Sequence, residues 1–313
     1  MGDKILNTEW DSELPRINLD NLNSRINDLN LDYDDYQEYF SVVIIISIAI
    51  LISIAGANGG KNYGSMPILF ICMIISFLIH WLVFIPSFLA KTERYFDITG
   101  TVTYLSLLGL AFCLTIQTTG SVLESQSILL IFLVAFWSLR LGTFLFARIL
   151  KDGEDKRFRD IKISFSKFLL SWTLSALWVF LTSANALTAI INNVPFKGDL
   201  FTYVGTTLWV LGFLFEVISD EQKRKFRADP ANSDSFISHG LWSYSRHPNY
   251  FGEIVLWLGI AFISFPTLVG WQFVTLISPV FVLLILTRVS GVNLLERKAD
   301  ETWGEFPAYK IYK

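Results

Sequence analysis

Residues 240–253 gather side chains that are well suited to binding a charged ligand. The segment reads Gly-Leu-Trp-Ser-Tyr-Ser-Arg-His-Pro-Asn-Tyr-Phe-Gly-Glu and precedes a long apolar run. Its proline fixes its own φ and disfavours a helical conformation at the histidine before it. A helix that begins after this turn presents free backbone amides and the positive end of its dipole, which favour an anion. A capped start of a membrane helix is the simpler interpretation, but it leaves the arginine, the histidine and the tyrosines unexplained. The segment therefore predicts recognition of a phosphate or carboxylate through Tyr244, Arg246, His247, Asn249, Tyr250 and Glu253.

Two other segments place basic residues at helical spacing. Arg140 interrupts an apolar run, and Arg148 follows it on the same predicted helix. An ionisable residue inside a span usually faces the interior of the bundle, although an arginine can also extend to the lipid headgroups. Residues 216–227 predict a helical face that carries Asp220, Lys223, Arg224 and Arg227. Because guanidinium groups match phosphate oxygens, both segments suit the phosphates of a nucleotide, with anionic lipid as the alternative ligand.

The elements that must position these residues are membrane-spanning helices. Of the 313 residues, 52% are hydrophobic, and the mean hydropathy is +0.47, which is too apolar for a soluble globular protein. A helix of about 20 apolar residues crosses the roughly 30 Å of a bilayer's hydrocarbon. Residues 254–287 carry no charge and would reach about 51 Å as one helix. Since Pro266 and Gly270 lie near the middle, we expect two spans there with a turn between them. The other six predicted spans cover residues 40–57, 67–89, 98–118, 127–147, 168–192 and 200–215.

The charges of the loops agree with eight spans. Lysine and arginine are concentrated in residues 148–167, in residues 223–246 and after residue 287, whereas residues 120–126 and 264–271 contain neither. Cytoplasmic loops are enriched in these two residue types. The sequence therefore predicts an all-α, multi-pass integral membrane bundle of about eight transmembrane helices, with both termini in the cytoplasm. We expect residues 1–38 to form an acidic, disordered tail and residues 39–313 to form a single membrane domain.

Several other classes of site are disfavoured by what the sequence lacks. Cys72 and Cys113 both lie in apolar runs, which argues against a disulfide framework. None of the three histidines stands at ligand spacing with another histidine or a cysteine, so we expect no metal site. The glycine patterns of a P-loop, a Rossmann domain and a nucleophile elbow are absent. We expect membrane lipids and a small lipid substrate as partners, and no nucleic acid; the sequence leaves the oligomeric state open.

The segment 240–253 strongly resembles the C-terminal signature of the steroid 5-alpha-reductase-like membrane family, in the branch named for domain of unknown function 1295. Residues 137–142, 154–158, 218–220 and 290–296 resemble further parts of that family, and the resemblance covers roughly residues 92–312. It implies a helical membrane bundle that binds NADPH from the cytoplasmic side. It also implies reduction of an activated carbon–carbon double bond in a steroid-like or enoyl lipid.

The resemblance also implies roles for individual residues. Tyr244 resembles a cofactor-contacting tyrosine, and Glu216 stands where the family has a cofactor-binding asparagine. The Gln-Glu-Leu-Pro motif that carries the catalytic glutamate of steroid reductases is absent. Glu93, Tyr95 and Asp97, between the second and third spans, are the alternatives for the acid. The residues expected to bind the cofactor are Arg140, Arg148, Asp220, Arg224, Arg227, Tyr244, Arg246, His247, Asn249, Tyr250 and Glu253.

Two other functions are compatible with the same residues. The Arg-His-Pro-x-Tyr-x-Gly pattern also resembles membrane isoprenylcysteine and phospholipid methyltransferases, which bind S-adenosylmethionine at this motif. Those enzymes have a second acidic segment after the last helix, which Glu296 and Glu301 would supply here. A lipid-binding membrane protein without catalysis is the third alternative, because the family's catalytic glutamate is missing.

Overall fold

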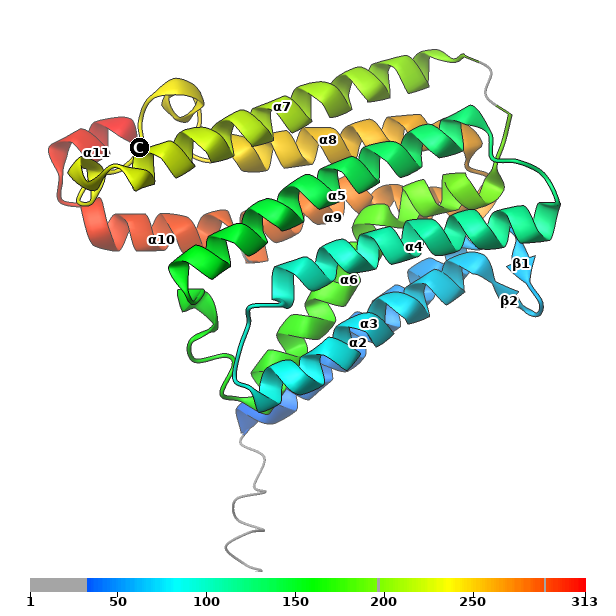
Figure 1. The fold of residues 1–313 in the computed structure, drawn as a ribbon, viewed down its shortest axis with the longest axis horizontal. Coiled ribbons are helices and arrows are strands. Elements are labelled where there is room, and N and C mark those ends of the chain that lie inside the picture. The colour runs from blue at the N-terminus through cyan, green and yellow to red at the C-terminus, as the bar shows by residue number, and fades with distance from the viewer. Residues whose placement is uncertain (1–32, 196–197, 290) are drawn as a thin grey trace, which may run out of the picture.

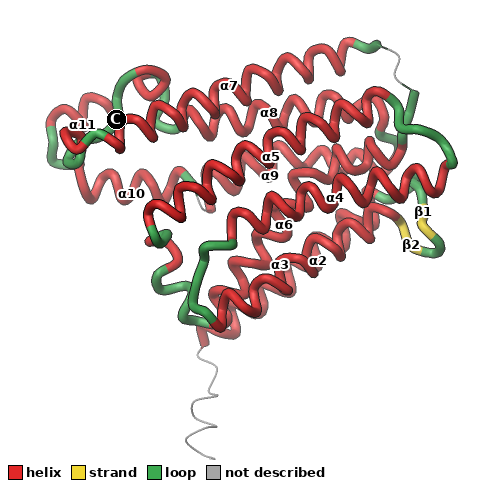
Figure 2. Tube along the Cα trace, in the orientation of Figure 1, coloured by secondary structure: helices red, strands yellow, loops and turns green. Residues whose placement is uncertain are grey.

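The computed structural model describes residues 33–195, 198–289 and 291–313, which form a bundle of helices (Figure 1). Apart from a two-stranded hairpin, the regular structure is helical (Figure 2). Most of the tail expected at residues 1–38 lies outside the described residues, and helix α2 already begins at Tyr33. The elements are α2 (Tyr33–Gly56), β1 (Asn62–Tyr63), β2 (Met66–Pro67), α3 (Ile68–Leu89), α4 (Phe96–Thr119), α5 (Ser125–Asp152), η1 (Lys156–Phe158), α6 (Phe165–Asn192), α7 (Leu200–Ala228), η2 (Pro230–Asn232), η3 (Gly240–Ser243), α8 (Pro248–Ser264), η4 (Phe265–Thr267), η5 (Gly270–Leu276), α9 (Ile277–Leu284), η6 (Ile285–Val289), α10 (Val292–Trp303) and α11 (Pro307–Tyr312).

The predicted number of spans is confirmed. Within the described residues, eight helical stretches are long and apolar enough to cross a membrane. The uncharged run 254–287 divides into two of them, as expected, with the break at η4 and at Gly270, whose φ is +52°. Glycine adopts this left-handed conformation without the steric cost that a Cβ atom imposes. The eighth span is not one regular helix, because it passes through η5, α9 and the π-helical η6.

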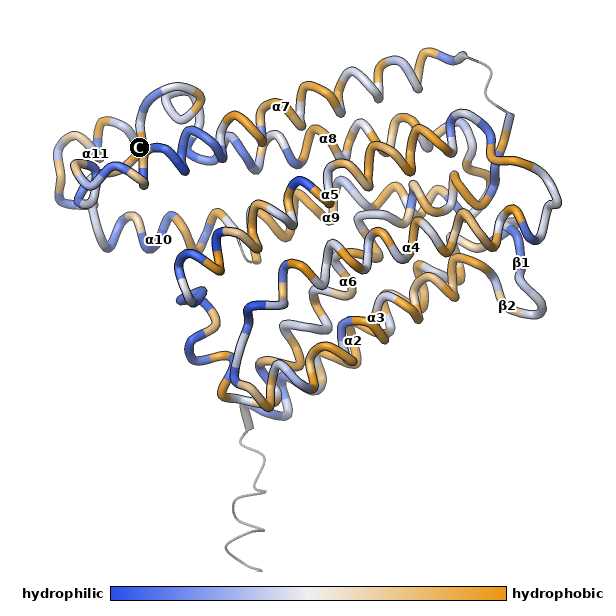
Figure 3. Tube along the Cα trace, in the orientation of Figure 1, coloured by the Kyte–Doolittle hydropathy of each residue, from blue (hydrophilic) through white to orange (hydrophobic). Residues whose placement is uncertain are grey.

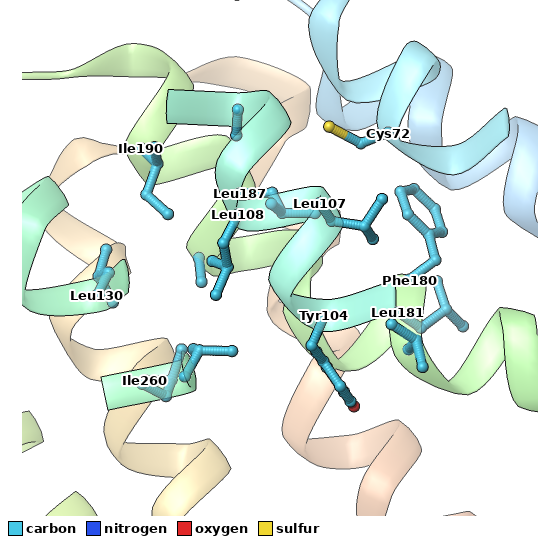
Figure 4. Close-up of a cluster of buried hydrophobic side chains, with 14 of the residues drawn as sticks. Cys72, Tyr104, Leu107, Leu108, Leu130, Phe180, Leu181, Leu187, Ile190 and Ile260 are labelled. Carbon is cyan, nitrogen blue, oxygen red and sulfur yellow. The ribbon is translucent and has the colours of Figure 1, made fainter. Parts of the chain in front are cut away.

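Helix α6 is the centre of the bundle. It contacts α2, α3, α4, α5, α8 and α9, and its side chains from Val179 to Ile191 are buried without interruption. A helix that is apolar on all sides is stable in this position because every face meets another helix. Figure 4 shows part of the resulting core, in which Leu187 and Ile190 of α6 lie near Leu107 and Leu108 of α4. Tyr104 brings a hydroxyl group into this otherwise apolar cluster (Figure 4).

Helices α7 and α8 pack against each other more closely than any other pair, because glycines face one another across their interface. A Cβ atom at Gly212 would lie 2.5 Å from the carbonyl oxygen of Gly252, and one at Gly252 would lie 2.6 Å from the backbone nitrogen of Glu216. Small residues of this kind let two membrane helices approach to backbone contact. The close approach brings the backbone of Glu216 next to the turn of α8 that carries Glu253.

Substitution of Gly252 by alanine should therefore destabilise the bundle. The added methyl group has no room between α7 and α8, and overpacking of this kind costs about 1 to 3 kcal/mol. We expect a lower midpoint of thermal unfolding in detergent. Gly109→Ala is the matched control, because no atom lies within 4 Å of a Cβ atom built at that helical glycine. Equal midpoints for the two variants would contradict the close packing.

The polar loops of the bundle are not shared equally between its two ends. The connections α3–α4, α5–α6 and α7–α8 lie at the same end as the C-terminus, as the predicted number of spans requires (Figure 1). Hydrophilic residues are concentrated where α5 and α7 finish at that end, whereas the middle of the helices is apolar (Figure 3). Helix α7 continues to Ala228, well past the expected limit at residue 215, so its charged last turns extend the helix at this basic end. That the basic end faces the cytoplasm stays a prediction.

Candidate functional site

Three acidic residues and one arginine form a buried cluster, here called the carboxylate cluster, between α5, α7 and α8. The guanidinium of Arg140 donates to Glu216 and also pairs with Asp220, each at 2.8 Å. The indole Nε1 of Trp137 donates to the second oxygen of Glu216 at 2.9 Å. Arg140 therefore faces the interior of the bundle and not the lipid headgroups.

The start of α8 completes this cluster. Asn249 donates from Nδ2 to Asp220 Oδ1 at 3.3 Å. Glu253, one turn later, is buried and lies within electrostatic range of Glu216 and Asp220. It accepts no hydrogen bond from the described part of the chain. Three carboxyl groups thus surround one guanidinium, and Glu253, which has no hydrogen-bond partner among the described residues, can accept from a donor on a ligand.

A second group, here called the basic triad, consists of Arg148 on α5 with Lys223 and Arg227 on α7. The three side chains are near enough for their positive charges to act on one another. Among the described residues none of the three forms an ion pair. The ammonium of Lys223 lies 4.5 Å from the centre of the Trp242 ring, where it makes a cation–π contact. Three neighbouring cations without a bound carboxylate are a favourable site for a multiply charged anion.

The turn before α8 is held by a residue from the C-terminal helix α10. Glu296 forms an ion pair with Arg246 and accepts a hydrogen bond from His247 Nε2 at 2.7 Å. Burial lowers the pKa of His247, and the hydrogen bond and charge of Glu296 oppose this only in part. The ring is therefore neutral near pH 7, with its proton on Nε2. The other nitrogen, Nδ1, is buried and has no partner among the described residues, and the ring stacks on Tyr250 at 5.6 Å.

The candidate acids lie between α3 and α4. Glu93 is fully engaged, because its carboxylate accepts from Lys162 Nζ and from the backbone nitrogen of Asp155, both at 2.8 Å. Tyr95 is half exposed. Asp97, in the first turn of α4, lies within electrostatic range of Arg148 of the basic triad. Asp97 is therefore a neighbour of the basic triad.

A buried tyrosine reaches the same region from the interior of the bundle. Tyr104 lies two turns further along α4 than Asp97, and its hydroxyl is 2.5 Å from Thr182 Oγ1. Since Thr182 itself donates to the carbonyl of Trp178, the hydrogen of this bond belongs to Tyr104. The ring of Tyr104 contacts Trp137 and Trp257, and its hydroxyl lies within electrostatic range of Glu253. Aromatic rings therefore connect the carboxylate cluster to the apolar core.

Comparison with known proteins places this chain in a family. The model of the family described as "Protein of unknown function (DUF1295)" matches residues 83–313, which include every residue of the carboxylate cluster, the basic triad and the turn before α8. The chain belongs to the DUF1295 family. A curated relative, 3-oxo-5-alpha-steroid 4-dehydrogenase 1 of Bos taurus, is 36% identical over 69 residues, which is 22% of this chain and 26% of the relative. The similarity thus spans about a quarter of that relative's length. No solved structure matches the chain.

In this DUF1295 chain, several predicted cofactor residues meet and others do not. Arg140, Asp220, Asn249 and Glu253 form one cluster, and Arg148 and Arg227 lie together in the basic triad. Arg224 points elsewhere and is paired with Glu221. The side chain of Tyr244 is 90% exposed. Arg246 and His247 are near each other, but both are bound to Glu296.

The sequence interpretation assigned no cofactor role to several residues that the structure places in this region. Lys223 was predicted to share the helical face of Asp220 and Arg227, but it was not among the residues expected to bind the cofactor. Glu216 was noted only as a departure from the family's asparagine, and its ion pair with Arg140 was not foreseen. No signal in the sequence indicates that Trp137 donates to Glu216. The described residues contain no group of three histidine, cysteine or acidic side chains that could hold a metal ion.

The side chains at this end of the bundle fit an anionic nucleotide. The basic triad offers two guanidinium groups and one ammonium group, which bind phosphate oxygens. Hydrogen-bonding atoms next to the basic triad come from Asn249, Glu253 and Tyr250 and from His247 Nδ1. Helix α7 connects the two parts of the region, because the triad members Lys223 and Arg227 follow Asp220 by one and two turns. Phosphates and the polar end of a ligand could therefore be held by a single helix.

Proposed function

We propose that this DUF1295 protein is a membrane-embedded reductase that uses NADPH to reduce an activated carbon–carbon double bond in a steroid-like or other enoyl lipid. The observation that carries the proposal is the basic triad, none of whose three cations forms an ion pair among the described residues, beside a buried polar cluster at one end of a membrane bundle. The partial similarity to a steroid dehydrogenase supports the reaction class and the use of NADPH. The basic end would face the cytoplasm, where this cofactor is available.

The roles of the residues follow from their charges. When bound, NADPH supplies a hydride to the β-carbon of the activated double bond. Arg148, Lys223 and Arg227 bind its phosphates. Asn249 and Asp220 orient the polar end of the cofactor. Glu253 lies behind them, where a carboxylate stabilises positive charge on a neighbouring ring.

The chain must also hold the substrate and give it a proton. The apolar interior around Trp137 and Trp257 is buried and excludes water. Alignment of two bound reactants in such a site supplies a large share of the rate enhancement. Glu93, Tyr95 and Asp97 stay predictions for the acid. Tyr104 is a further candidate, because its hydroxyl is buried near Glu253 and would polarise a substrate carbonyl if it donated to that carbonyl in place of Thr182.

One observation favours a second candidate function, methyl transfer from S-adenosylmethionine. The carboxylate cluster contains three carboxyl groups, one guanidinium and the ring of Trp137, a combination that suits a sulfonium cation. Glu296, expected in that class of enzyme, does contact Arg246 and His247. S-adenosylmethionine has no phosphate, however, so it leaves the basic triad without a role. We therefore place the reductase first.

Calorimetric titration of the purified protein in detergent separates these functions. We expect NADPH to bind with a dissociation constant of about 1 to 100 μM, as is common for enzyme ligands. Binding should weaken as salt is added, because the triad contributes charge interactions. S-adenosylmethionine should bind at least tenfold more weakly. Uptake of S-adenosylmethionine without NADPH would establish the methyltransferase instead, and no uptake of either would favour the non-catalytic lipid-binding alternative.

A further inference from the structure

The C-terminal helices α10 and α11 lie against the loop between α7 and α8 (Figure 1). Phe236 of that loop makes ring contacts with Trp303, Tyr309 and Tyr312, at 5.9, 5.1 and 5.3 Å between centroids. Tyr309 is buried in this contact. A terminal segment that buries aromatic rings in this way is a fixed part of the fold, because free termini seldom bury apolar surface.

Two polar contacts connect the same helices to the turn before α8. The hydroxyl of Tyr312 donates to the backbone carbonyl of Trp242 at 2.6 Å. The carboxylate of Glu296 binds Arg246 and His247 with one oxygen each. Glu296 is only 18% exposed, and each of its oxygens accepts a hydrogen bond. The carboxylate therefore fixes the positions of Arg246 and His247, which an exposed surface charge would not do. Both ends of the segment 242–247 are therefore held from the C-terminal side.

Trp242 connects the C-terminal helices to the basic triad. Its indole Nε1 donates to the backbone carbonyl of Ser219 on α7 at 3.0 Å, and its ring lies beneath the ammonium of Lys223. The same residue thus contacts the C-terminal segment through its carbonyl, α7 through its nitrogen, and Lys223 through its ring. Lys223 bears a long side chain with several rotamers, and two arginines repel it. The ring of Trp242 and the charge of Asp220 favour the rotamer in which Lys223 belongs to the triad.

We propose that Glu296 and Tyr312 are positioning residues for the phosphate site, acting through Trp242 on Lys223, so that helices α10 and α11 form one wall of that site. The proposal deepens the proposed function, since it rests on NADPH as the ligand of the triad. The placement of Lys223 by these contacts does not depend on which anion binds. Glu296 and Tyr312 do not touch the ligand. They hold residues 242–247 in the position that keeps three positive charges together.

The test compares nucleotide affinities in four variants of the full chain, with NADPH and inorganic pyrophosphate as separate probes. We expect Glu296→Gln to weaken the binding of NADPH by about tenfold, the usual effect of losing a charged hydrogen bond. Tyr312→Phe should weaken this binding by about threefold, because it removes a neutral hydrogen bond. Glu305→Gln is the matched control, since this exposed acid on the same segment pairs only loosely with Lys310. The fourth variant, Lys223→Gln, allows a double-mutant cycle. In the Lys223→Gln background, Glu296→Gln should have little further effect on affinity.

Each outcome decides the proposal. If Glu296→Gln binds NADPH as Glu305→Gln does, or if its effect is undiminished in the Lys223→Gln background, the positioning role is wrong while the reductase proposal stands. If the natural protein binds pyrophosphate but not NADPH, the reductase proposal fails, and the same cycle with pyrophosphate decides the role of Glu296. If it binds neither, both proposals fail. A general loss of folding in Glu296→Gln would lower binding in both backgrounds equally, so the cycle detects it.

Discussion

Replacing Arg140 with alanine should destabilise the protein by about 3 to 5 kcal/mol, the usual cost of removing one partner from a buried ion pair. Arg140 is the only cation that contacts Glu216 and Asp220 among the described residues. Without it, these two acids and Glu253 would be buried together with no ion-pair partner among the described residues. We expect a large decrease in the midpoint of thermal unfolding in detergent, and no measurable binding of NADPH.

Two further variants test the cause of that effect. Neutralising Glu216 as well, in Arg140→Ala with Glu216→Gln, should recover part of the lost stability, because fewer unpaired charges remain buried. Arg159→Ala is the control, since Arg159 pairs with Glu154 at an exposed position where ion pairs contribute about 0 to 1 kcal/mol. If Arg140→Ala lowers the midpoint of thermal unfolding no more than Arg159→Ala does, Arg140 is not needed to stabilise the carboxylate cluster.

Replacing both Lys223 and Arg148 with glutamine should weaken the binding of NADPH about a hundredfold or more. The same change should stabilise the unliganded protein. Each residue is expected to bind phosphate through a charged hydrogen bond, which contributes about 1.5 to 3 kcal/mol. In the absence of an anion, their positive charges repel each other and that of Arg227. Removal of two of the three charges relieves this repulsion. The measurements are calorimetric affinity for NADPH and the thermal midpoint without ligand.

Arg224→Gln provides the matched control for this pair. Arg224 is one residue from Lys223, but it is exposed and already paired with Glu221. Its substitution should change neither NADPH affinity nor stability by more than the error of measurement. An unchanged affinity in the Lys223 and Arg148 variant would exclude the basic triad as the phosphate site. A lower thermal midpoint in that variant would show that the triad has a counter-ion in the free protein.

The two predicted changes in the stability of the unliganded protein have opposite signs, for a physical reason. Arg140 is surrounded by acids, so it stabilises the folded protein whether or not a ligand is present. Lys223 and Arg148 form no ion pair among the described residues, so their main contribution appears when an anion binds. Residues that bind a ligand often reduce the stability of the unliganded fold in this way. Stability measured without ligand can therefore distinguish structural cations from ligand-binding cations in this protein.

Much of the architecture could be predicted from the sequence alone, because the signals involved are local. Long apolar runs must form helices in a bilayer, and this established the all-α membrane class and the eight spans. Pro266 and Gly270 placed the turn within residues 254–287, since one helix of that length would exceed the bilayer. The segment 240–253 likewise indicated both the family and the end of the bundle at which the candidate site lies.

The tertiary structure alone decided which charged residues remain available for a ligand. Three arginines, Arg140, Arg148 and Arg246, are equivalent as sequence signals. In the structure, Arg140 is paired with Glu216 and Asp220, and Arg246 is paired with Glu296. Arg148 forms no ion pair among the described residues. Ion pairing depends on distances of a few ångströms between side chains on different helices. Two membrane spans separate residues 246 and 296 in the sequence, and no local pattern reports how close their side chains lie.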